Sequence, residues 1–494
     1  MATYKTPGVY LEEIPHFPPT ITGVETALPA FIGYTEKAER DNTSLTLVPT
    51  PIYDFNGYVR LFGGPPSQKV TLWLDAQNNI ADAKLNHAFS LYDSLRLFFD
   101  NGGKTCIIVS VGHYGEQISH PALAQGLAAI ETLPKPTIIV MPEAVATEDH
   151  GIALYAEALA QCARTGNRMT ICELRKTDQS GFEEEVSSFR SGIGSDNLMH
   201  GAVYAPWLNT EFSRKKRLGD ITLKRKADES LIAPESLTND ETIRELIAEI
   251  RLAEQPVSRV RAPKASSSTS LNTTPDSEQL NQLLYQKFDL FRAWADRATS
   301  VLNTSPPSGA IAGLYARVDS HRGVWKSPAN ESLRSVQSPV FNINQEMQAP
   351  LNVHETGKSI NAIRAFAGKG TLVYGARTLK GNDSEWRYIS IRRLFNFVEA
   401  SVYNSLQRFV VERNDATTWL RAQGMIENFL TTLWRHGALQ GSKPEHAFFV
   451  KVGLNQSMTA LDIEQGRMII QIGMAPIRPA EFVIFRSVYQ MLES

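Results

Sequence analysis

The sequence has few of the residues on which disulfide frameworks and metal centres depend. It contains 3 cysteines and 10 histidines among 494 residues. So few cysteines argue against a disulfide framework, and the histidines are scattered, with no Cys/His group at zinc spacing. Cys106 and Cys172 lie in apolar runs, where a free thiol is expected to be a small core residue. We therefore expect no metal and no other cofactor.

The sequence also lacks an excess of one charge and any long apolar run. A formal net charge of -2 gives no overall attraction to nucleic acid or to an anionic membrane. No apolar run approaches the roughly 18 residues of a membrane span. The first seven residues, Met1 to Pro7, contain no apolar signal core. These absences predict synthesis in the cytoplasm, with no membrane contact by this chain itself.

Familiar catalytic motifs are present only as fragments. Gly103-Lys104-Thr105 resembles the end of a phosphate-binding loop, but Phe98 stands where the first glycine belongs, and the order here is helix, loop, strand. His354-Glu355 begins a zinc-protease pattern, but Lys358 takes the place of the second histidine. Gly368, Gly370 and Gly375 have the wrong spacing for a dinucleotide fingerprint. These fragments do not support a catalytic site.

Residues 85 to 206 alternate between helical periodicity and short apolar runs. A helix is expected from Leu85 to Phe99, ended by Asn101-Gly102-Gly103. Strands are expected at 106–111, 137–141, 169–174 and 202–205, with helices around 122–133 and 148–164 and a weaker one before the last strand. Near-continuous apolar strands joined by helices predict a mostly parallel sheet covered on both faces.

Such a sheet offers one enzymatic alternative. The carboxyl ends of its strands would bring together Gly112-His113-Tyr114, Pro142-Glu143 and Glu173. In open α/β sheets this edge is where small ligands bind. A cytoplasmic α/β enzyme with its site at this edge therefore stands as the alternative, on fold analogy alone.

The C-terminal third reads as two helices followed by strands. Ser390 is placed to cap the first helix, and Asp415 the second, which Gly437 would close. The expected buried stripes are Ile391, Leu394, Phe395, Val398, Val402, Leu406, Phe409 and Val410, then Trp419, Leu420, Ile426, Phe429, Leu430, Leu433 and Trp434. Strands are expected at 447–452 and 467–474.

Residues 211 to 280 differ in character and read as a surface insertion. Basic clusters occur at Arg214–Arg217 and Lys224–Lys226, and Thr238 to Glu241 fits a capping box for a following helix. Ser and Thr runs within 266–275 indicate a polar linker. The clusters could contact nucleic acid or form a solvated face. The lack of interleaved aromatic residues favours the solvated face.

Both ends of the chain read as short strands with no local partner. These strands are Val9, Tyr10, Leu11, Glu12, Glu13 and Ile14, between Pro7-Gly8 and Pro15, and Phe482, Val483, Ile484 and Phe485, continuing to about Tyr489. Flanking prolines belong at sheet edges, and a lone strand is unstable in water. Each strand either folds back on its own domain or adds to a sheet in a neighbour.

Several segments resemble the contractile tail sheath family of phages, tailocins and extracellular contractile injection systems. The matching stretches are Pro7–Ile14, Thr26–Ala38, Phe98–Gly103, Pro306–Gly309, Tyr315–Arg317, Gly323–Glu331, Tyr374–Leu379, Trp386–Tyr388, Arg392–Phe395 and Pro479–Phe485. The resemblance covers nearly the whole chain and is most specific from 306 to 486. Residues 211 to 280 fall outside it.

The resemblance implies a structural protein and not an enzyme. Such subunits stack as six-membered rings around an inner tube and contract to drive the tube through a target envelope. The implied partners are other copies of the chain, the inner tube protein, and baseplate and terminator proteins, with no nucleic acid. The implied location is a phage tail or a phage-tail-like extracellular particle. Donation of the two end strands to neighbouring subunits would join the lattice.

The resemblance also implies a division of the chain and a tube-facing surface. The fold class is α/β and α+β, with an outer domain that holds the mostly parallel sheet and an inner domain built from the N-terminal arm and the C-terminal third. The expected segments are an arm at 1–22, outer regions at 23–210 and 281–355, the insertion at 211–280, the inner domain at 356–478 and a C-terminal arm at 479–494. Arg392, Arg393 and Arg408, near the long helix, are the candidates to face an acidic tube.

Overall fold

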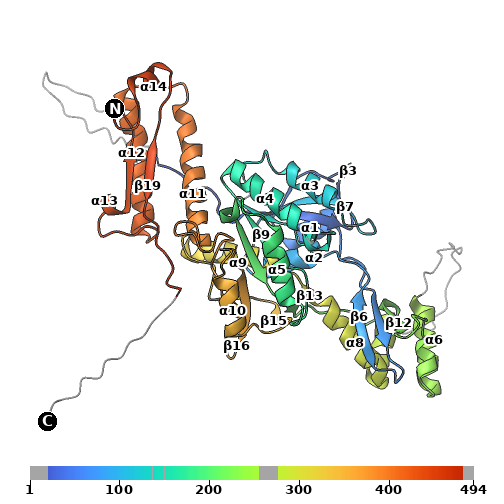
Figure 1. The fold of residues 1–494 in the computed structure, drawn as a ribbon. Coiled ribbons are helices and arrows are strands. Elements are labelled where there is room, and N and C mark those ends of the chain that lie inside the picture. Colours follow the sequence, from blue (N-terminus) through green and yellow to red (C-terminus); the bar gives the residue numbers. More distant parts are fainter. Residues whose placement is uncertain (1–19, 136, 150, 255–275, 482–494) are drawn as a thin grey trace, which may run out of the picture. The chain divides into compact units, whose positions relative to one another are not determined.

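The computed structural model describes residues 20–135, 137–149, 151–254 and 276–481 (Figure 1). These residues form two compact units. The large unit comprises residues 26–322 and 327–392, and the described parts of the small unit are residues 20–25, 323–326 and 393–481. The chain thus passes between the units four times, at 25/26, 322/323, 326/327 and 392/393. The end strands predicted at 9–14 and 482–485 lie outside the described residues.

A nine-stranded sheet forms the centre of the large unit, in the order β14-β17-β16-β10-β9-β8-β1-β7-β4. Its strands are β1 (Pro29–Thr35), β4 (Thr50–Ile52), β7 (Cys106–His113), β8 (Ile138–Val140), β9 (Met169–Glu173), β10 (Gly201–Ala205), β14 (Glu331–Ser332), β16 (Asn361–Phe366) and β17 (Gly370–Val373). Neighbouring strands from β16 to β7 run parallel, and β4, β14 and β17 add antiparallel pairs at the ends. The mostly parallel sheet is confirmed.

Alternating side chains of the sheet contribute to two cores, one on each face. In β1, for example, Ala30 and Ile32 belong to one core and Phe31 to the other. One face is covered by α3 (His120–Ala129), α4 (Ile152–Thr165), α5 (Phe182–Gly192) and α10 (Gln345–Asn352), the other by α1 (Phe55–Phe62), α2 (Leu91–Asp100) and α9 (Ser308–Arg322). Shorter elements are β2 (Glu39–Arg40), β3 (Thr43–Ser44), β11 (Leu208–Thr210), β13 (Thr304–Ser305), β15 (Val336–Pro339), η1 (Ala144–Ala146) and η2 (Leu198–His200).

The helices α2 and α9 approach each other with backbone against backbone. A Cβ atom added at Gly309 would lie 2.1 Å from the carbonyl oxygen of Ser94, and one added at Gly313 would lie 2.3 Å from that of Phe98. Real Cβ atoms do not come this close to a backbone, so both positions require glycine. The two glycines, spaced four residues apart on one face of α9, therefore set how closely α9 and α2 approach each other.

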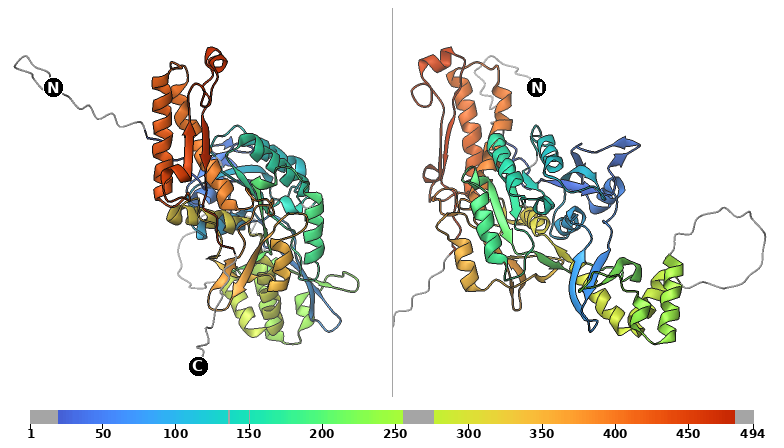
Figure 2. Two further views of the ribbon diagram at one scale, coloured as in Figure 1. Left: turned by 60° about the vertical axis from the view of Figure 1, so that its left-hand side comes forward. Right: turned by 45° about the vertical axis from the view of Figure 1, so that its right-hand side comes forward.

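A further core lies within the large unit, in a group of elements called the lobe below. The lobe contains a three-stranded sheet in the order β12-β5-β6 and three helices. Its elements are β5 (Val70–Leu74), β6 (Ile80–Leu85), β12 (Ile221–Arg225), α6 (Glu241–Glu254), α7 (Ser277–Lys287) and α8 (Asp289–Leu302), with the turns η3 (Leu218–Asp220) and η4 (Pro234–Leu237). Figure 2 shows the blue strands of the lobe beside its yellow-green helices, although these segments are far apart in sequence.

The small unit is a helical pair against a two-stranded ribbon. It contains α11 (Ile389–Leu406), which begins in the large unit, η5 (Gln407–Phe409), α12 (Ala416–Arg435), α13 (Pro444–Ala447), β18 (Phe448–Lys451), α14 (Ala460–Glu464) and β19 (Gln471–Met474). Asp415 caps α12 as predicted, accepting a hydrogen bond from the Thr418 amide at 3.1 Å. Ile21 and Val324 complete the apolar core of this unit.

Several local predictions were wrong. Leu85 ends strand β6, and α2 begins only at Leu91. Asp240, and not Thr238, caps α6, because its Oδ1 accepts from the Thr242 amide at 2.9 Å. Ser390 is the second residue of α11, and its hydroxyl bonds with that of Ser327 at 3.0 Å.

Two of the expected segments do not coincide with the compact units. The small unit resumes at residue 393 and not at 356, because β16 and β17, at 361–373, belong to the large sheet. The segment expected to be an insertion at 211–280 contributes β12, α6 and the start of α7 to the folded lobe. The part of the expected linker at 266–275 lies outside the described residues.

Candidate functional site

Glu143 lies at the sheet edge where an α/β enzyme would have its site, but its carboxylate accepts hydrogen bonds from three backbone amides. Oε2 accepts from the Tyr34 amide at 2.8 Å, and Oε1 accepts from the amides of Ser90 and Leu91 at 3.0 and 3.1 Å. The last two amides belong to the N-terminus of α2, where a carboxylate is favoured. Burial raises the pKa of Glu143 to about 7, although the three amide donors oppose this shift. The side chain therefore fastens α2 to the strand ends.

Glu173, the last residue of β9, has the same role at the N-terminus of α9. Its Oε1 accepts from the Ser308 hydroxyl at 3.1 Å, and its Oε2 accepts from the Ser308 amide at 3.3 Å. Burial raises the pKa of Glu173 to about 8, and the nearby charge of Glu143 adds to the shift. The two carboxylates suggested for an enzyme site are thus each engaged by the start of a helix.

The raised pKa values of Glu143 and Glu173 predict that the stability of the large unit depends on pH. Both titrate near 4.5 in an unfolded chain, and at about 7 and 8 in the folded protein. Between these values the folded state binds more protons, so the free energy of unfolding falls as pH rises. We expect a lower Tm at pH 8.5 than at pH 6, with a slope of at most about 1.4 kcal/mol per pH unit for each carboxyl.

Scanning calorimetry across this pH range measures the effect. The double variant Glu143→Gln, Glu173→Gln should lose most of the slope, because neither amide titrates. A variant that keeps the full slope would show that other groups cause it.

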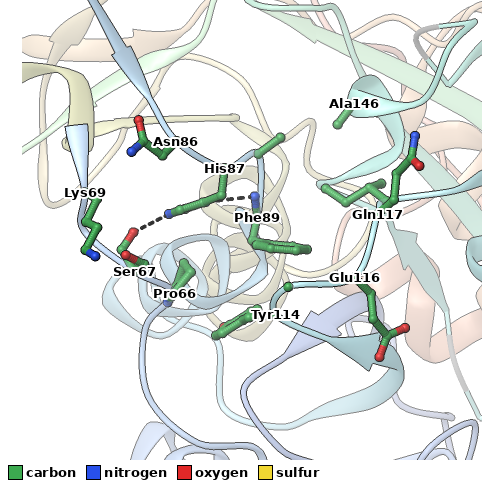
Figure 3. A pocket seen from close by; sticks show the side chains of 13 residues that line it. Pro66, Ser67, Lys69, Asn86, His87, Phe89, Tyr114, Glu116, Gln117 and Ala146 are labelled. Atoms are coloured by element: carbon green, nitrogen blue, oxygen red, sulfur yellow. Dashed lines mark hydrogen bonds between the residues drawn. The ribbon is translucent and has the colours of Figure 1, made fainter. Parts of the chain in front are cut away.

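A pocket of about 520 Å³ lies where the strands of the lobe meet the loop after β7 (Figure 3). Its histidine, His87, is held by the backbone at both ring nitrogens. Nε2 is 2.6 Å from the Ser67 carbonyl oxygen, and Nδ1 accepts from the Phe89 amide at 3.1 Å. Burial lowers the pKa of His87. This histidine therefore joins the segment before β5 to the segment after β6, which does not favour a role as a general base.

The motif fragments found in the sequence are structural. Gly103-Lys104-Thr105 lies between the end of α2 and the start of β7, so no helix begins there. The Nδ1 of His354 is 2.9 Å from the Thr356 hydroxyl, in the segment between α10 and β16. In the ranges that the structure describes, no three His, Cys, Asp or Glu side chains gather as a metal site, and no helix is long and apolar enough to cross a membrane.

All three cysteines are free and buried, as predicted for Cys106 and Cys172. Burial raises the pKa of the Cys162 thiol to about 12, so this thiol is not a ready nucleophile. The cysteines therefore belong to the core.

The basic clusters are largely paired within the chain. The Arg214 guanidinium is buried and lies 2.7 Å from the carboxylate of Asp93 in α2. Further ion pairs join Lys215 to Glu278, Lys216 to Asp296 and Lys224 to Glu229, at 2.8, 2.8 and 3.1 Å. Charges neutralised in this way offer little to a phosphate backbone, so the contacts favour the solvated, paired interpretation.

The ribbon of β18 and β19 is the element of the small unit best suited to receive another strand. The two strands pair in an antiparallel register, with Phe449 opposite Gly473, and no third strand joins them in the described part of the chain. Val450 is buried in the core of the unit, while Phe449 is half-exposed and its ring covers Gly473. The ribbon therefore has one supported face and unpaired strand edges.

The three arginines suggested to face a tube are in different environments. Arg392 and Arg393 are only 5% and 4% exposed, and the Arg392 guanidinium lies 4.5 Å from the centre of the Trp386 ring. Arg408 is exposed, and its Nε donates to the Ser405 carbonyl oxygen at 3.1 Å. A guanidinium that is buried in its own subunit has little surface left for a tube. We therefore retain this prediction for Arg408.

Comparison with known proteins points to one family. Residues 381–490 match the model of the phage tail sheath C-terminal domain. A putative prophage major tail sheath protein of Pseudomonas aeruginosa strain UCBPP-PA14 is 25% identical over 194 residues, which cover 39% of this chain and 47% of that protein. The chain thus spans about half the length of this relative.

Solved structures match over almost the whole chain. The sheath of the anti-feeding prophage in its contracted state is 28% identical with a TM-score of 0.60, covering 98% of this chain and 99% of that one. The contracted PVC sheath complex, from an extracellular contractile injection system, is 25% identical with a TM-score of 0.59, covering 99% and 98%. The chain is thus similar over almost its whole length to contractile sheath proteins. Its mixed α/β architecture matches that of the solved sheaths.

Two exposed apolar residues of this chain were placed wrongly by the sequence pattern. Val410 and Leu420 were placed on buried helical stripes, but they are 65% and 69% exposed. Val411, next to Val410, is 98% exposed. The adjacent valines could have indicated that the helical stripe ends before them. Two β-branched residues at a helix end favour neither a helix nor a turn.

Proposed function

We propose that this chain is the structural subunit of a contractile sheath, which polymerises as stacked six-membered rings around an inner tube and contracts to drive the tube through a target envelope. The observation that carries the proposal is the match of nearly the whole chain to solved contractile sheaths. The proposed partners are further copies of this chain, the inner tube protein, and baseplate and terminator proteins. One solved match comes from the anti-feeding prophage baseplate.

The proposed joint between subunits is strand addition to the β18–β19 ribbon. The predicted end strands at 9–14 and 482–485 would supply the donor and acceptor groups that the open edges of the ribbon require. An added strand makes about four to six backbone hydrogen bonds, each worth roughly 1 kcal/mol net. Such a joint is strong, directional and independent of exact side-chain fit, so it survives a change in the angle between subunits.

Contraction then needs two packings of the same units with the joints intact in both. No nucleotide is required if assembly leaves the extended sheath in a metastable state. A difference of a few kcal/mol per subunit suffices, because many copies change together. The particle, a phage tail or a phage-tail-like extracellular machine, would be built from chains made in the cytoplasm.

The enzymatic alternative has no supporting observation. The carboxylates at the strand ends hold the starts of α2 and α9, and the pocket histidine is held by the backbone. We therefore propose a non-enzymatic role.

Deletion of residues 1–15 tests the strand joint. We expect the shortened chain to keep its circular dichroism spectrum and Tm, because the described cores do not use these residues, and to lose all polymers in electron micrographs. Deletion of residues 1–5, which leaves the strand at 9–14, is the matched control and should assemble like the full chain. Normal polymers from the longer deletion would overturn the joint.

A further inference from the structure

The pocket where the lobe meets the loop after β7 has a wall of three aromatic rings (Figure 3). The Phe89 ring lies between those of His87 and Tyr114, with its centre 5.7 and 5.1 Å from theirs. The planes of the His87 and Phe89 rings differ by only 25°. All three side chains are half-buried, so each ring keeps part of its surface open. This aromatic wall, as it is called below, offers a ligand a row of three rings.

Contacts within the protein fix the aromatic wall before any ligand binds. Buried Tyr34 packs against Phe89, with ring centres 5.5 Å apart. The Tyr114 hydroxyl donates to the Gly64 carbonyl oxygen at 3.3 Å, and the backbone holds both ring nitrogens of His87. A preformed site loses little conformational freedom on binding, which favours the binding of a ligand that fits it.

Neutral polar side chains line other parts of the pocket. They belong to Ser67, Asn86 and Gln117. The Asn86 Oδ1 accepts from the Thr71 hydroxyl at 2.9 Å, which leaves its NH₂ group for another partner. Among the described residues, no hydrogen bond uses that NH₂ group, the Ser67 hydroxyl or the side-chain amide of Gln117. Together these groups offer a ligand both donors and acceptors.

The charges that line the pocket are balanced. Lys69 is opposed by Glu116, whose Oε1 accepts from the His113 amide at 3.0 Å. His87 is neutral, because its Nδ1 accepts a hydrogen bond and burial lowers its pKa. A phosphate or carboxylate is best held by several cationic groups, which one lysine beside a glutamate does not supply. A wholly apolar ligand would displace water from the polar side chains without replacing its hydrogen bonds. The lining therefore suits a neutral ligand that has both apolar faces and hydroxyl groups.

We propose that this pocket binds a neutral carbohydrate, a short oligosaccharide whose sugar rings stack on the aromatic wall. The C–H groups on one face of a pyranose ring suit the electron-rich faces of aromatic rings. The sugar hydroxyls both donate and accept, so they can pair with Ser67, Asn86 and Gln117. The volume of about 520 Å³ lies within the roughly 300–1,000 Å³ of ligand pockets. The site lies within one chain, so the inference stands apart from the proposed sheath function.

The test screens the full-length chain against an array of neutral oligosaccharides of glucose, galactose, mannose or N-acetylglucosamine. Hits are then titrated by isothermal calorimetry, with adenosine and glucose 6-phosphate as comparison probes. Adenosine brings a flat ring for stacking, and glucose 6-phosphate adds negative charge to a sugar. We expect at least one oligosaccharide to bind, and to bind more tightly than either comparison probe.

Three variants and a control show whether the lining side chains hold the sugar. Tyr114→Ala removes one ring of the aromatic wall and should weaken binding by about tenfold or more. Gln117→Ala removes an exposed side chain without disturbing the core, and it should weaken binding by about threefold or more. Tyr114→Phe keeps the ring and should bind within about twofold of the wild type. Gln77→Ala, in the exposed turn between β5 and β6, is the matched control and should bind like the wild type.

Thermal melting followed by circular dichroism checks that each variant is folded. Failure of every oligosaccharide to bind the wild type would overturn the proposal. Wild-type affinity in both Tyr114→Ala and Gln117→Ala would also overturn it, because the sugar would then bind elsewhere. Tighter binding of adenosine than of any oligosaccharide would assign the pocket to a flat aromatic ligand instead.

Discussion

Replacement of Gly309 by valine is expected to prevent the large unit from folding. A Cβ at this position would lie 2.1 Å from the Ser94 carbonyl oxygen, so α2 and α9 would have to separate. Both helices lie on the same face of the sheet, and both are buried there. Neither backbone can move without opening that core, so we expect a loss of about 4 kcal/mol or more. Soluble yield and urea unfolding, followed by circular dichroism, measure it.

A second glycine in a helix is the control for this substitution. Gly424 lies in the middle of α12, and an added Cβ would meet no atom within 4 Å. Gly424→Ala should therefore stabilise the protein by about 0.5–1 kcal/mol, through reduced freedom of the unfolded chain. A Gly309→Val protein with the wild-type unfolding midpoint would show that the close approach of α2 and α9 does not exist.

Replacement of Glu143 by alanine is the second change with a large expected effect. It leaves the amides of Tyr34, Ser90 and Leu91 without their acceptor. Unpaired buried donors cost about 1–3 kcal/mol each, so we expect a loss of roughly 4–6 kcal/mol. The change also removes the link between the end of the sheet and the start of α2.

Two further variants show whether the carboxylate oxygens cause this effect. Glu143→Gln keeps the shape and one acceptor oxygen, and it should fall between the wild type and alanine. Glu148→Ala removes an exposed carboxylate five residues further on, and it should change the midpoint by less than about 0.5 kcal/mol. Equal midpoints for Glu143→Ala and Glu148→Ala in urea titrations would contradict the role assigned to Glu143.

Sequence patterns predicted the central sheet well because its strands are buried on both faces. Short continuous apolar runs such as those of β7 and β9 are typical of strands buried on both faces. The helices between them show clear periodicity. The order of the strands could not be read in the same way. β1 lies between β7 and β8, and β16 joins β10 from some 160 residues further along the chain. Such pairings depend on packing across the whole unit.

The lobe was harder to predict because its strands come from distant segments. β5 pairs with β12, which lies about 150 residues later, so neither strand shows its partner locally. Leu85 happened to fit the helical spacing of α2, although it belongs to β6. The contacts of the basic clusters were equally hidden, since Arg214 pairs with Asp93 in another part of the unit.

The candidate contact residues could be predicted only in part. Helical periodicity continues through Val410, so the pattern alone placed an exposed residue on the buried stripe. Charge likewise suggested Arg392, whose guanidinium in fact lies over the Trp386 ring. Glu143 and Glu173 were placed correctly at the strand ends, but only the geometry reveals that they hold helices. Periodicity indicates on which face of a helix or strand a side chain lies, but it does not indicate which groups that side chain contacts.

The four passages of the chain between the units affect the order of events during synthesis. Ile21 leaves the ribosome early, but apart from Val324 the core that buries it is made from residues beyond 390. The Val24 amide likewise finds its acceptor only in Ser401. At about 5–20 residues per second, translation takes roughly 20–75 seconds to cover that interval. A chain that stops short of its last hundred residues lacks most of the core that buries Ile21. We therefore expect unfinished copies to be excluded from the proposed sheath.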